Sequence, residues 1–370
     1  MDLFGLIQLI LFVAMLVALT KPVGLYLVRV LDAEGKTFLD PVLRPTERLF
    51  YRLFGINPGK EQDWKGYTVS MLCFSLVGLL FTYAILRLQH LLPLNPQGFG
   101  PVGADLAFNT AASFTTNTNW QNYGGESTLS YFSQMVGLTL HNFASAAVGI
   151  GVAAALVRGI AGNSSKTIGN FWVDLIRINL YLLLPICFVF ALFLVSQGVI
   201  QNFKGYGKAA LVEPVLSEVP IKDAAGEEVR DEKGNTVMKT QKMKTQIIPQ
   251  GPVASQAAIK MLGTNGGGFF NANAAHPYEN PTPLSNFLQI LSIFLIPSGL
   301  TYYLGRMVKK QQHGWAVWSA MAILFLAALL ACWWAESVGN PRLHALGVDP
   351  ASGNMEGKEV RFGIFNSALF

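Results

Sequence analysis

Two segments of the chain combine short polar side chains with a backbone that can adopt unusual conformations. Neither segment gathers the acids, bases or nucleophiles that catalysis needs. Their main-chain carbonyls could instead replace the water shell of a cation such as K+, with Thr and Asn side chains holding the loop in shape. Glycine allows positive φ, so successive carbonyls can turn toward one axis. The residues are Thr116, Asn117, Thr118 and Asn119 in the first segment, and Thr264, Asn265, Gly266, Gly267 and Gly268 in the second.

A short helix-prone stretch precedes each polar segment, one beginning at Gly103 and the other at Gly251. Each stretch has only about ten residues, whereas a helix needs about 20 residues to cross a bilayer. Such a stretch can form a re-entrant half-helix if protein surrounds it. A half-helix that ends at the polar segment directs its negative dipole end at the bound cation.

An internal repeat relates the two segments. Thr116 and Asn117 match Thr264 and Asn265, and the Ser-x-Phe-x-Gln pattern at 130–134 recurs at 285–289. The repeated unit is a helix, a half-helix, an extended strand and a second helix, used twice in the same orientation, as in many transport proteins. One such loop alone is more often a turn than a filter. The recurrence of two loops in register favours the filter.

The composition indicates a membrane protein. Only 13% of the 370 residues are charged and 51% are hydrophobic, whereas soluble domains carry about 25% charged residues. The net charge of +5 includes no basic stripe with interleaved aromatics that would bind nucleic acid. We expect an all-α polytopic protein that contacts membrane lipid and no nucleic acid. Six apolar stretches predict spanning helices at 3–20, 67–86, 129–157, 175–198, 284–304 and 315–335.

The distribution of Lys and Arg predicts the orientation of the chain. These residues gather at 21–65, 158–177 and 305–314, which we place in the cytoplasm by the positive-inside rule. The N-terminus and the long segment 199–283 then lie outside. Within that segment, the polar stretch 227–244 is typical of an exposed hairpin.

The predicted spans and loops divide the chain into four parts. The tail at 357–370 has the character of another half-helix, but neither Thr-Asn nor a Gly-rich strand follows it. We therefore interpret the third unit as truncated. The parts are an extra helix with a cytoplasmic loop at 1–65, a first pore unit at 66–158, a second at 170–304 with an insertion at 199–250, and an incomplete third unit at 315–370.

Several other polar residues have weaker claims to function. Asp105, Glu126 and Glu279 follow spanning helices on the outer side; they could attract cations or be ordinary solvated carboxylates. His141 and Asn142 lie within the third span, where a structural hydrogen bond is favoured over a role in lining a cavity. No catalytic motif and no ATP-binding motif was found, so ATP chemistry would have to come from a partner chain.

These residues resemble the potassium-binding A subunit of the bacterial Kdp potassium-transporting ATPase. The similarity covers essentially the whole chain, and the string IKMLGTNGGGFFNAN at 259–273 is its most specific part. Further matching stretches lie at 94–97, 116–121, 130–135, 251–256, 276–277, 279–281 and 354–359.

The resemblance implies a fold and a function beyond what spacing indicates. It implies a relative of K+ channels and of Trk/Ktr transporters, with four pore repeats in one chain of the bacterial cytoplasmic membrane. External K+ would bind in a filter formed in part by 116–119 and 264–268, then pass to the P-type ATPase B subunit of a complex with C and F subunits. Two alternatives are a stand-alone K+ channel or Trk/Ktr-like symporter, and a membrane-embedded hydrolase with His141 as its base.

Overall fold

The structure is a computed structural model, and it divides the chain into two compact units. One unit comprises Met1–Gln201 and Pro252–Phe370, and the other comprises Asn202–Gly251. The residues that the structure describes are 3–32, 35–162, 166–221, 229, 231, 235–271, 274–349, 353–355 and 361–370.

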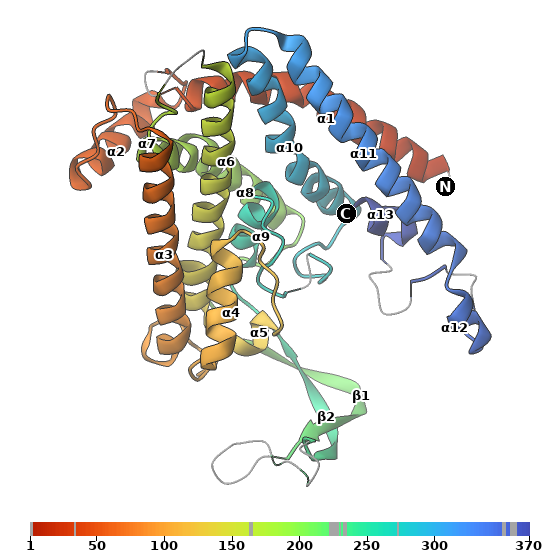
Figure 1. The fold of residues 1–370 in the computed structure, drawn as a ribbon. Coiled ribbons are helices and arrows are strands. Elements are labelled where there is room, and N and C mark those ends of the chain that lie inside the picture. The colour runs from red at the N-terminus through yellow and green to blue at the C-terminus, as the bar shows by residue number, and fades with distance from the viewer. Residues whose placement is uncertain are drawn as a thin grey trace. The chain divides into compact units, whose positions relative to one another are not determined.

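Six helical runs in the described residues are long and apolar enough to cross a membrane (Figure 1). This agrees with the six predicted spans and makes the chain a multi-pass membrane protein. The first run extends beyond its predicted end at residue 20, as far as Val30. This added part is packed against other parts of the protein, since Gly24, Leu27 and Val30 are buried. The runs are Leu3–Val30, Trp64–Leu91, Ser133–Ala161, Phe171–Ser196, Pro283–Met307 and Gln311–Ala345.

The helices of the larger unit include short elements between the spans. Two of these, α4 and α9, have 12 and 10 residues and correspond to the predicted half-helices. The α-helices are α1 (Leu3–Val30), α2 (Asp40–Leu53), α3 (Trp64–Leu88), α4 (Ala104–Thr115), α5 (Gly125–Thr128), α6 (Leu140–Ala161), α7 (Phe171–Arg177), α8 (Leu184–Ser196), α9 (Val253–Leu262), α10 (Pro283–Met307), α11 (Gln311–Val338), α12 (Pro341–Ala345) and α13 (Gly363–Leu369), with a 3-10 turn at Gln89–Leu91.

Helix α10 packs against both α1 and α11 (Figure 1). Two glycines allow the close contact with α1. A Cβ atom at Gly24 would lie 2.6 Å from Cβ of Tyr302, and one at Gly299 would lie 2.5 Å from Cγ1 of Val23. Small residues at such contacts are typical of helix packing in membranes, where hydrophobic burial does not drive association.

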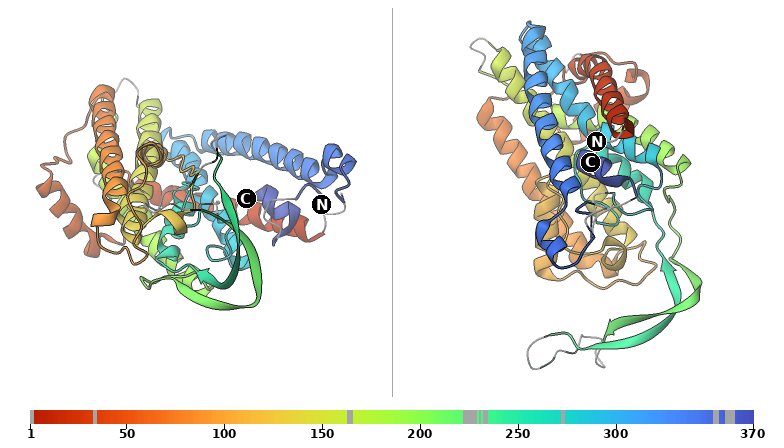
Figure 2. Two further views of the ribbon diagram at one scale, coloured as in Figure 1. Left: turned by 90° about the horizontal axis from the view of Figure 1, so that it is seen from below. Right: turned by 90° about the vertical axis from the view of Figure 1, so that its right-hand side faces the viewer.

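Helices α3 and α6 lie side by side, and α4 packs against α3 (Figures 1 and 2). The carboxylate of Asp63 begins α3 by accepting a hydrogen bond from the amide of Gly66 at 2.8 Å. Leu86 of α3, Phe114 of α4 and Leu138 share one buried apolar cluster. This cluster fixes the position of the first short helix.

Two spans contain a π-helical segment, Ser133–Thr139 before α6 and Ile178–Leu183 between α7 and α8. The wider turn leaves carbonyls that need other donors: the hydroxyl of Thr139 donates to the carbonyl of Gln134 at 2.8 Å, and the amide of Asn179 to that of Leu175 at 2.8 Å. π-helical segments often mark functional sites.

The second unit is an antiparallel hairpin of β1 (Gly207–Pro220) and β2 (Met238–Ile248). Its register runs from Gly207 opposite Ile248 to Pro220 opposite Met238, with an irregularity after Ala210. The hairpin predicted at 227–244 therefore belongs to a longer ribbon. Within it, the amide of Asp231 donates to the carbonyl of Asn235 at 2.8 Å, whereas 222–228, 230 and 232–234 lie outside the described residues.

The half-helix predicted at 357–370 corresponds to the shorter helix α13. Phe365 and Leu369 of this helix are buried in an apolar cluster with Phe12 of α1 and Ile290 of α10. Residues 356–360 lie outside the described part of the chain. The described part of the tail is thus anchored by packing against the first and fifth spans.

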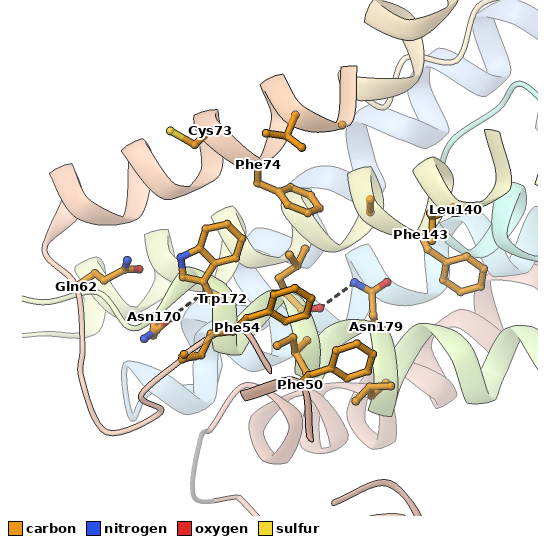
Figure 3. A pocket seen from close by; sticks show the side chains of 18 of the residues that line it. Phe50, Phe54, Gln62, Cys73, Phe74, Leu140, Phe143, Asn170, Trp172 and Asn179 are labelled. Carbon is orange, nitrogen blue, oxygen red and sulfur yellow. Dashed lines mark hydrogen bonds between the residues drawn. The ribbon is translucent and has the colours of Figure 1, made fainter. Parts of the chain in front are cut away.

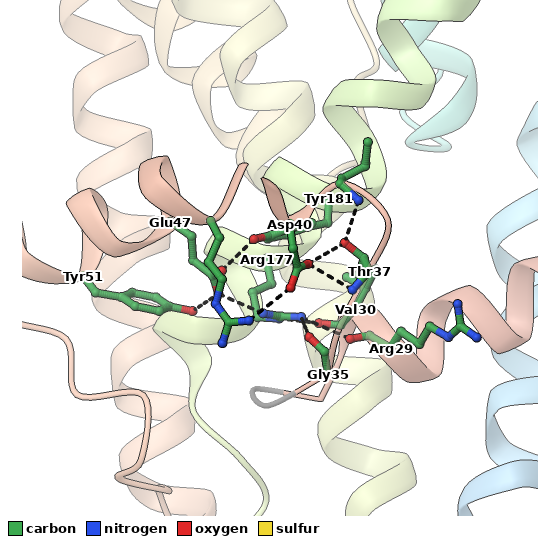
Figure 4. Close-up of polar contacts among 11 residues, drawn as sticks. Arg29, Val30, Gly35, Thr37, Asp40, Glu47, Tyr51, Arg177 and Tyr181 are labelled. Atoms are coloured by element: carbon green, nitrogen blue, oxygen red, sulfur yellow. Dashed lines mark hydrogen bonds and ion pairs between the residues drawn. The ribbon is translucent and has the colours of Figure 1, made fainter. Parts of the chain in front are cut away.

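A buried ion pair connects α7 with α2 (Figure 4). This pair was not predicted from the sequence. The guanidinium of Arg177 lies 2.8 Å from the carboxylate of Glu47, and both side chains are almost fully buried. Arg177 also donates to the carbonyls of Val30, Arg29 and Gly35. The hydroxyl of Tyr181 donates to the other carboxylate oxygen of Glu47 at 2.7 Å. The network therefore holds the end of α1 and the middle of α2 against the fourth span.

Arg177→Met should lower the free energy of unfolding by about 3–5 kcal/mol, because Glu47 would stay buried without its partner. Thermal and urea unfolding of the detergent-solubilised protein would measure this loss. The control Arg44→Met breaks a partly exposed pair with Asp40, which should change stability by no more than about 0.5 kcal/mol. Equal effects of the two variants would contradict the role of the Arg177 network.

Candidate functional site

The two short helices end in the same backbone pattern. After α4, the amides of Thr118 and Asn119 both donate to the carbonyl of Ser113, at 3.0 and 3.2 Å. After α9, the amides of Asn265 and Gly266 both donate to the carbonyl of Lys260, at 2.9 and 3.4 Å. By these backbone bonds, Thr118 corresponds to Asn265. The alignment of the two Thr-Asn pairs in the sequence, which matches Asn117 with Asn265, is therefore off by one residue from the structural alignment.

Positive φ angles recur at the matched positions. Asn117 and Thr264 have φ of 60° and 55°, and Asn119 and Gly266 have 56° and 92°. Asn and Gly tolerate this region, but a β-branched residue such as Thr264 is strained there. Such strain persists only where the surroundings over-determine the conformation, and it concentrates at functional sites.

Hydrogen bonds join the two loops directly. The side-chain amide of Asn265 donates to Oδ1 of Asn117, and the amide of Asn117 lies 3.3 Å from the carbonyl of Gly263. Gln121 makes two bonds with Gly268: Oε1 accepts from its amide at 2.9 Å, and Nε2 donates to its carbonyl at 3.2 Å. The structure thus brings together the two segments that the sequence singled out.

The close approach of the loops depends on glycine. A Cβ atom at Gly267 would lie 1.9 Å from the carbonyl oxygen of Asn119 and 2.8 Å from Oε1 of Gln121. Real Cβ atoms do not approach main-chain oxygens this closely. Gly267 is therefore required by packing between the loops as well as by backbone freedom.

Helix α6 supports both loops from one of its faces. Oδ1 of Asn142 accepts from Asn119 at 3.2 Å, the carbonyl of Asn142 accepts from Asn265 at 3.3 Å, and the hydroxyl of Ser145 donates to Asn117 at 2.8 Å. Nδ1 of His141 instead pairs with the hydroxyl of Thr82 on α3. The hydrogen bonds favoured for His141 and Asn142 are therefore present, but His141 also lines a cavity, which is the alternative that the sequence left open.

Several carbonyls of the two loops remain without a donor. In the described part of the chain, no hydrogen bond ends on the main-chain carbonyls of residues 117–119 or 265–267. The side chains of Thr116, Thr118 and Thr264 are exposed, whereas those of Asn119 and Asn265 are buried. The asparagines thus hold the loops, and the carbonyls of 117–119 and 265–267 accept no hydrogen bond from the described residues.

The carboxylates predicted near the loops have different environments. Asp105 is exposed and Glu126 is half-buried. Glu279 is fully buried, 2.8 Å from the ammonium of Lys260, which is also fully buried. The reading of Glu279 as an ordinary solvated carboxylate is therefore wrong, and its role in attracting cations stays a prediction.

Sequence reasoning missed three supporting residues: Gln121, Gln134 and Lys260. Nε2 of Gln134 donates to the carbonyl of Phe269 at 3.2 Å, and Gln134 lies within the first π-helical segment. Lys260 gave a usable signal, because an ionisable residue in a membrane-embedded helix requires a partner. Gln134 gave a weaker signal as the last residue of the repeated Ser-x-Phe-x-Gln pattern. Gln121 gave none, since its bonds to the second loop go to main-chain atoms of Gly268.

His276 lies close to the end of the second loop. Its ring stacks on Phe270 with centroids 4.1 Å apart. Burial lowers the pKa of His276 below its usual 6.5, and the carboxylates of Glu279 and Glu126 oppose this effect. The ring is therefore predominantly neutral at pH 7 and adds no full positive charge beside the loop.

A separate cavity of about 1310 Å³ lies between α3, α6 and α7 (Figure 3). Phe54, Phe74 and Trp172 contribute to its largely apolar lining, and neither polar loop does. The amides of Asn170 and Asn179, which also line it, bond to main-chain carbonyls. The lining also includes Lys60, Glu61, Asp63 and His141. The described residues hold no cluster of three or more His, Cys, Asp or Glu for a metal.

Comparison with known proteins identifies one family. The family model described as the potassium-transporting ATPase A subunit matches residues 10–370. A protein of Koribacter versatilis, named potassium-transporting ATPase potassium-binding subunit, is 56% identical over 99% of this chain and 61% of its own length. Proteins of the same name from Methylacidiphilum infernorum and Acidobacterium capsulatum are 54% and 55% identical, over 98% and 99% of this chain.

These relatives are longer than the present chain, which covers 59% and 60% of the last two. Nevertheless, more than half of the aligned residues are identical, and each alignment covers at least 98% of this chain. The chain belongs to the family of potassium-transporting ATPase A subunits, KdpA.

Proposed function

We propose that this chain binds K+ from outside the cell in a filter and contributes to its transport across the membrane. The observation that supports this most directly is a group of carbonyls that accept no hydrogen bond from the described residues, at the point where two short helices end side by side. Carbonyl oxygens can replace the hydration shell of K+ without the burial of several carboxylates. The filter residues are Thr116, Asn117, Thr118, Asn119, Thr264, Asn265, Gly266, Gly267 and Gly268.

The two helix ends add to the attraction. The last turns of α4 and α9 carry the negative ends of their helix dipoles and lead directly into the loops. The pore units extend over 66–158 and 170–304, after an extra helix and loop at 1–65. Residues 315–370 would belong to a third unit, and the relatives are longer than this chain.

ATP-driven transport requires other subunits in this proposal. The relatives are named as a potassium-binding subunit of an ATPase, which supports a division of labour between K+ binding and ATP hydrolysis. K+ would pass from this chain to a P-type ATPase B subunit, with C and F subunits completing the complex. The chain itself binds no ATP.

The site favours transport over chemistry on a substrate. His141, the only base considered for a hydrolase, pairs with Thr82 on the face of α6 away from the loops. The protein would lie in the bacterial cytoplasmic membrane with its N-terminus outside. Hairpin β1–β2 would then be extracytoplasmic and α2 cytoplasmic.

Gly267→Ala should raise the KM of the intact transporter for K+ roughly tenfold or more. Overpacking costs about 1–3 kcal/mol, and each 1.4 kcal/mol is about tenfold in affinity. K+-dependent ATP hydrolysis by the purified complex would measure KM. Gly100→Ala, at a position with open space for a Cβ atom, is the matched control. An unchanged KM in Gly267→Ala would exclude the second loop as a filter.

Asn265→Asp should also weaken K+ binding, because a carboxylate cannot donate to Asn117 and would face its Oδ1. The loss of a buried hydrogen bond costs about 1–3 kcal/mol, so KM should again rise roughly tenfold or more. Asn122→Asp adds the same charge at an exposed position of the first loop. If both variants raise KM equally, the effect comes from charge alone and the role of Asn265 is refuted.

The orientation can be tested by labelling single cysteines in intact cells. In a background without Cys73 and Cys332, which are exposed, Thr240→Cys in β2 should react with a membrane-impermeant maleimide. Arg48→Cys in α2 should react only after the membrane is permeabilised. The reverse pattern would place the N-terminus in the cytoplasm.

A further inference from the structure

Lys260 and Glu279 form the one ion pair among the described residues in which both side chains are fully buried. The ammonium of Lys260 lies 2.8 Å from Oε2 of Glu279. A buried pair seldom stabilises a fold more than apolar residues of the same size would, because both charges lose their hydration. Its presence directly behind the second loop therefore calls for a role other than stability.

The pair contacts the second loop at both ends. The main-chain carbonyl of Lys260 accepts the amides of Asn265 and Gly266, where the chain turns out of α9. Oε1 of Glu279 accepts from the amide of Phe270 at 3.4 Å, beyond the last glycine. The loop is thus held between a lysine before it and a glutamate after it.

The side chain of Lys260 also fills the space behind the glycines. A Cβ atom at Gly268 would lie 2.6 Å from Cδ and 2.9 Å from Nζ of Lys260. Three consecutive glycines have no side chains with which to anchor themselves. The buried lysine supplies that missing packing at Gly268, whereas Gly267 packs against Asn119 and Gln121 of the first loop.

The two charges of the pair must balance for a cation to bind nearby. An unpaired ammonium behind the loop would repel a cation held by the loop carbonyls, and an unpaired carboxylate would attract any cation regardless of size. When the ammonium and the carboxylate are paired, the electric field at the loop comes from the carbonyl dipoles. These dipoles are the source of selectivity in carbonyl filters.

The first loop is held in a different way. Ser113 occupies the position in α4 that corresponds to Lys260, and its hydroxyl donates to the carbonyl of Trp120 at 2.9 Å. The shared backbone turn therefore does not need a charged residue. The ion pair is a special feature of the glycine-rich loop.

We propose that Lys260 and Glu279 are positioning residues for ion selection, which fix the carbonyls of Gly266 and Gly267 and keep the charge behind them neutral. This inference rests on the proposed function of the loops. Neither side chain touches the ion; both act through the backbone of the second loop.

The test uses the intact transporter complex with Lys260→Met, Glu279→Gln and the double variant. KM for K+ and the ratio of KM for Rb+ to that for K+ are measured by cation-stimulated ATP hydrolysis. Glu279→Gln, which leaves a buried positive charge, should raise KM for K+ at least tenfold. The double variant should recover most of that loss but keep an altered Rb+ to K+ ratio, because charge balance returns while the clamp does not.

Assembly is followed in parallel by gel filtration of the complex. Lys310→Met, an exposed lysine, is the control for loss of a positive charge. Glu279→Asp keeps the charge with a shorter reach and provides a milder variant; its Rb+ to K+ ratio should also shift. A purely structural role would lower the amount of complex and leave both KM and the ratio unchanged, and this result would overturn the inference.

Failure of this inference can be told apart from failure of the proposed function. If Gly267→Ala raises KM while the pair variants change neither KM nor the ratio, the loops form a filter and the pair does not tune it. If neither set of variants alters KM, the loops are not the K+ site.

Discussion

A backbone that leaves its helix within a membrane protein must find partners for its carbonyls, and this constraint organises the whole site. The side-chain donors of the two loops are engaged by each other and by neighbouring groups. Asn265 donates to Asn117, and Asn117 donates to the carbonyls of Gly263 and Thr264. Those bonds determine which oxygens are left over. The remaining carbonyls, at 117–119 and 265–267, have the chemistry to hold a dehydrated cation.

Each loop is held partly by the other helix–loop–helix unit. Gln134 and Asn142, both in the third span, bond to Phe269 and Asn265 of the second unit. The π-helical segment Ser133–Thr139 contains Gln134 and directly precedes α6. Two consecutive residues near the start of α6, His141 and Asn142, contact different parts of the protein. His141 reaches Thr82 on α3, while Asn142 faces the loops. A shift of the third span would therefore disturb both loops at once, which makes the pair of loops a single structural element.

Much of the fold could be predicted because hydropathy and helix length are local properties. The six spans and the two short helices follow from apolar run lengths, and the loops from Thr, Asn and Gly. The interactions between segments could not be predicted. Helix α2 is held by Arg177, more than a hundred residues away, and Glu279 pairs with Lys260 of α9 from the far side of the loop that separates them. The one-residue shift between the sequence match and the backbone match could not be predicted either. Aligning the two Thr-Asn pairs compares residue types, whereas the φ angles depend on the turn that follows each helix.

The unequal support of the two loops follows from their composition. The first loop has four side chains of its own, and a neutral hydroxyl from Ser113 is enough to anchor its far end. The second has three glycines, and Thr264 adopts a positive φ that disfavours a β-branched residue. Strain of this kind costs of the order of 1 kcal/mol or more, so the loop would relax unless it were held on both sides. Asn117 and Gln121 hold it from the first loop, and Lys260 and Glu279 hold it from behind. The freedom that lets glycine carbonyls turn toward an ion is thus compatible with a defined site only because the surrounding residues remove it.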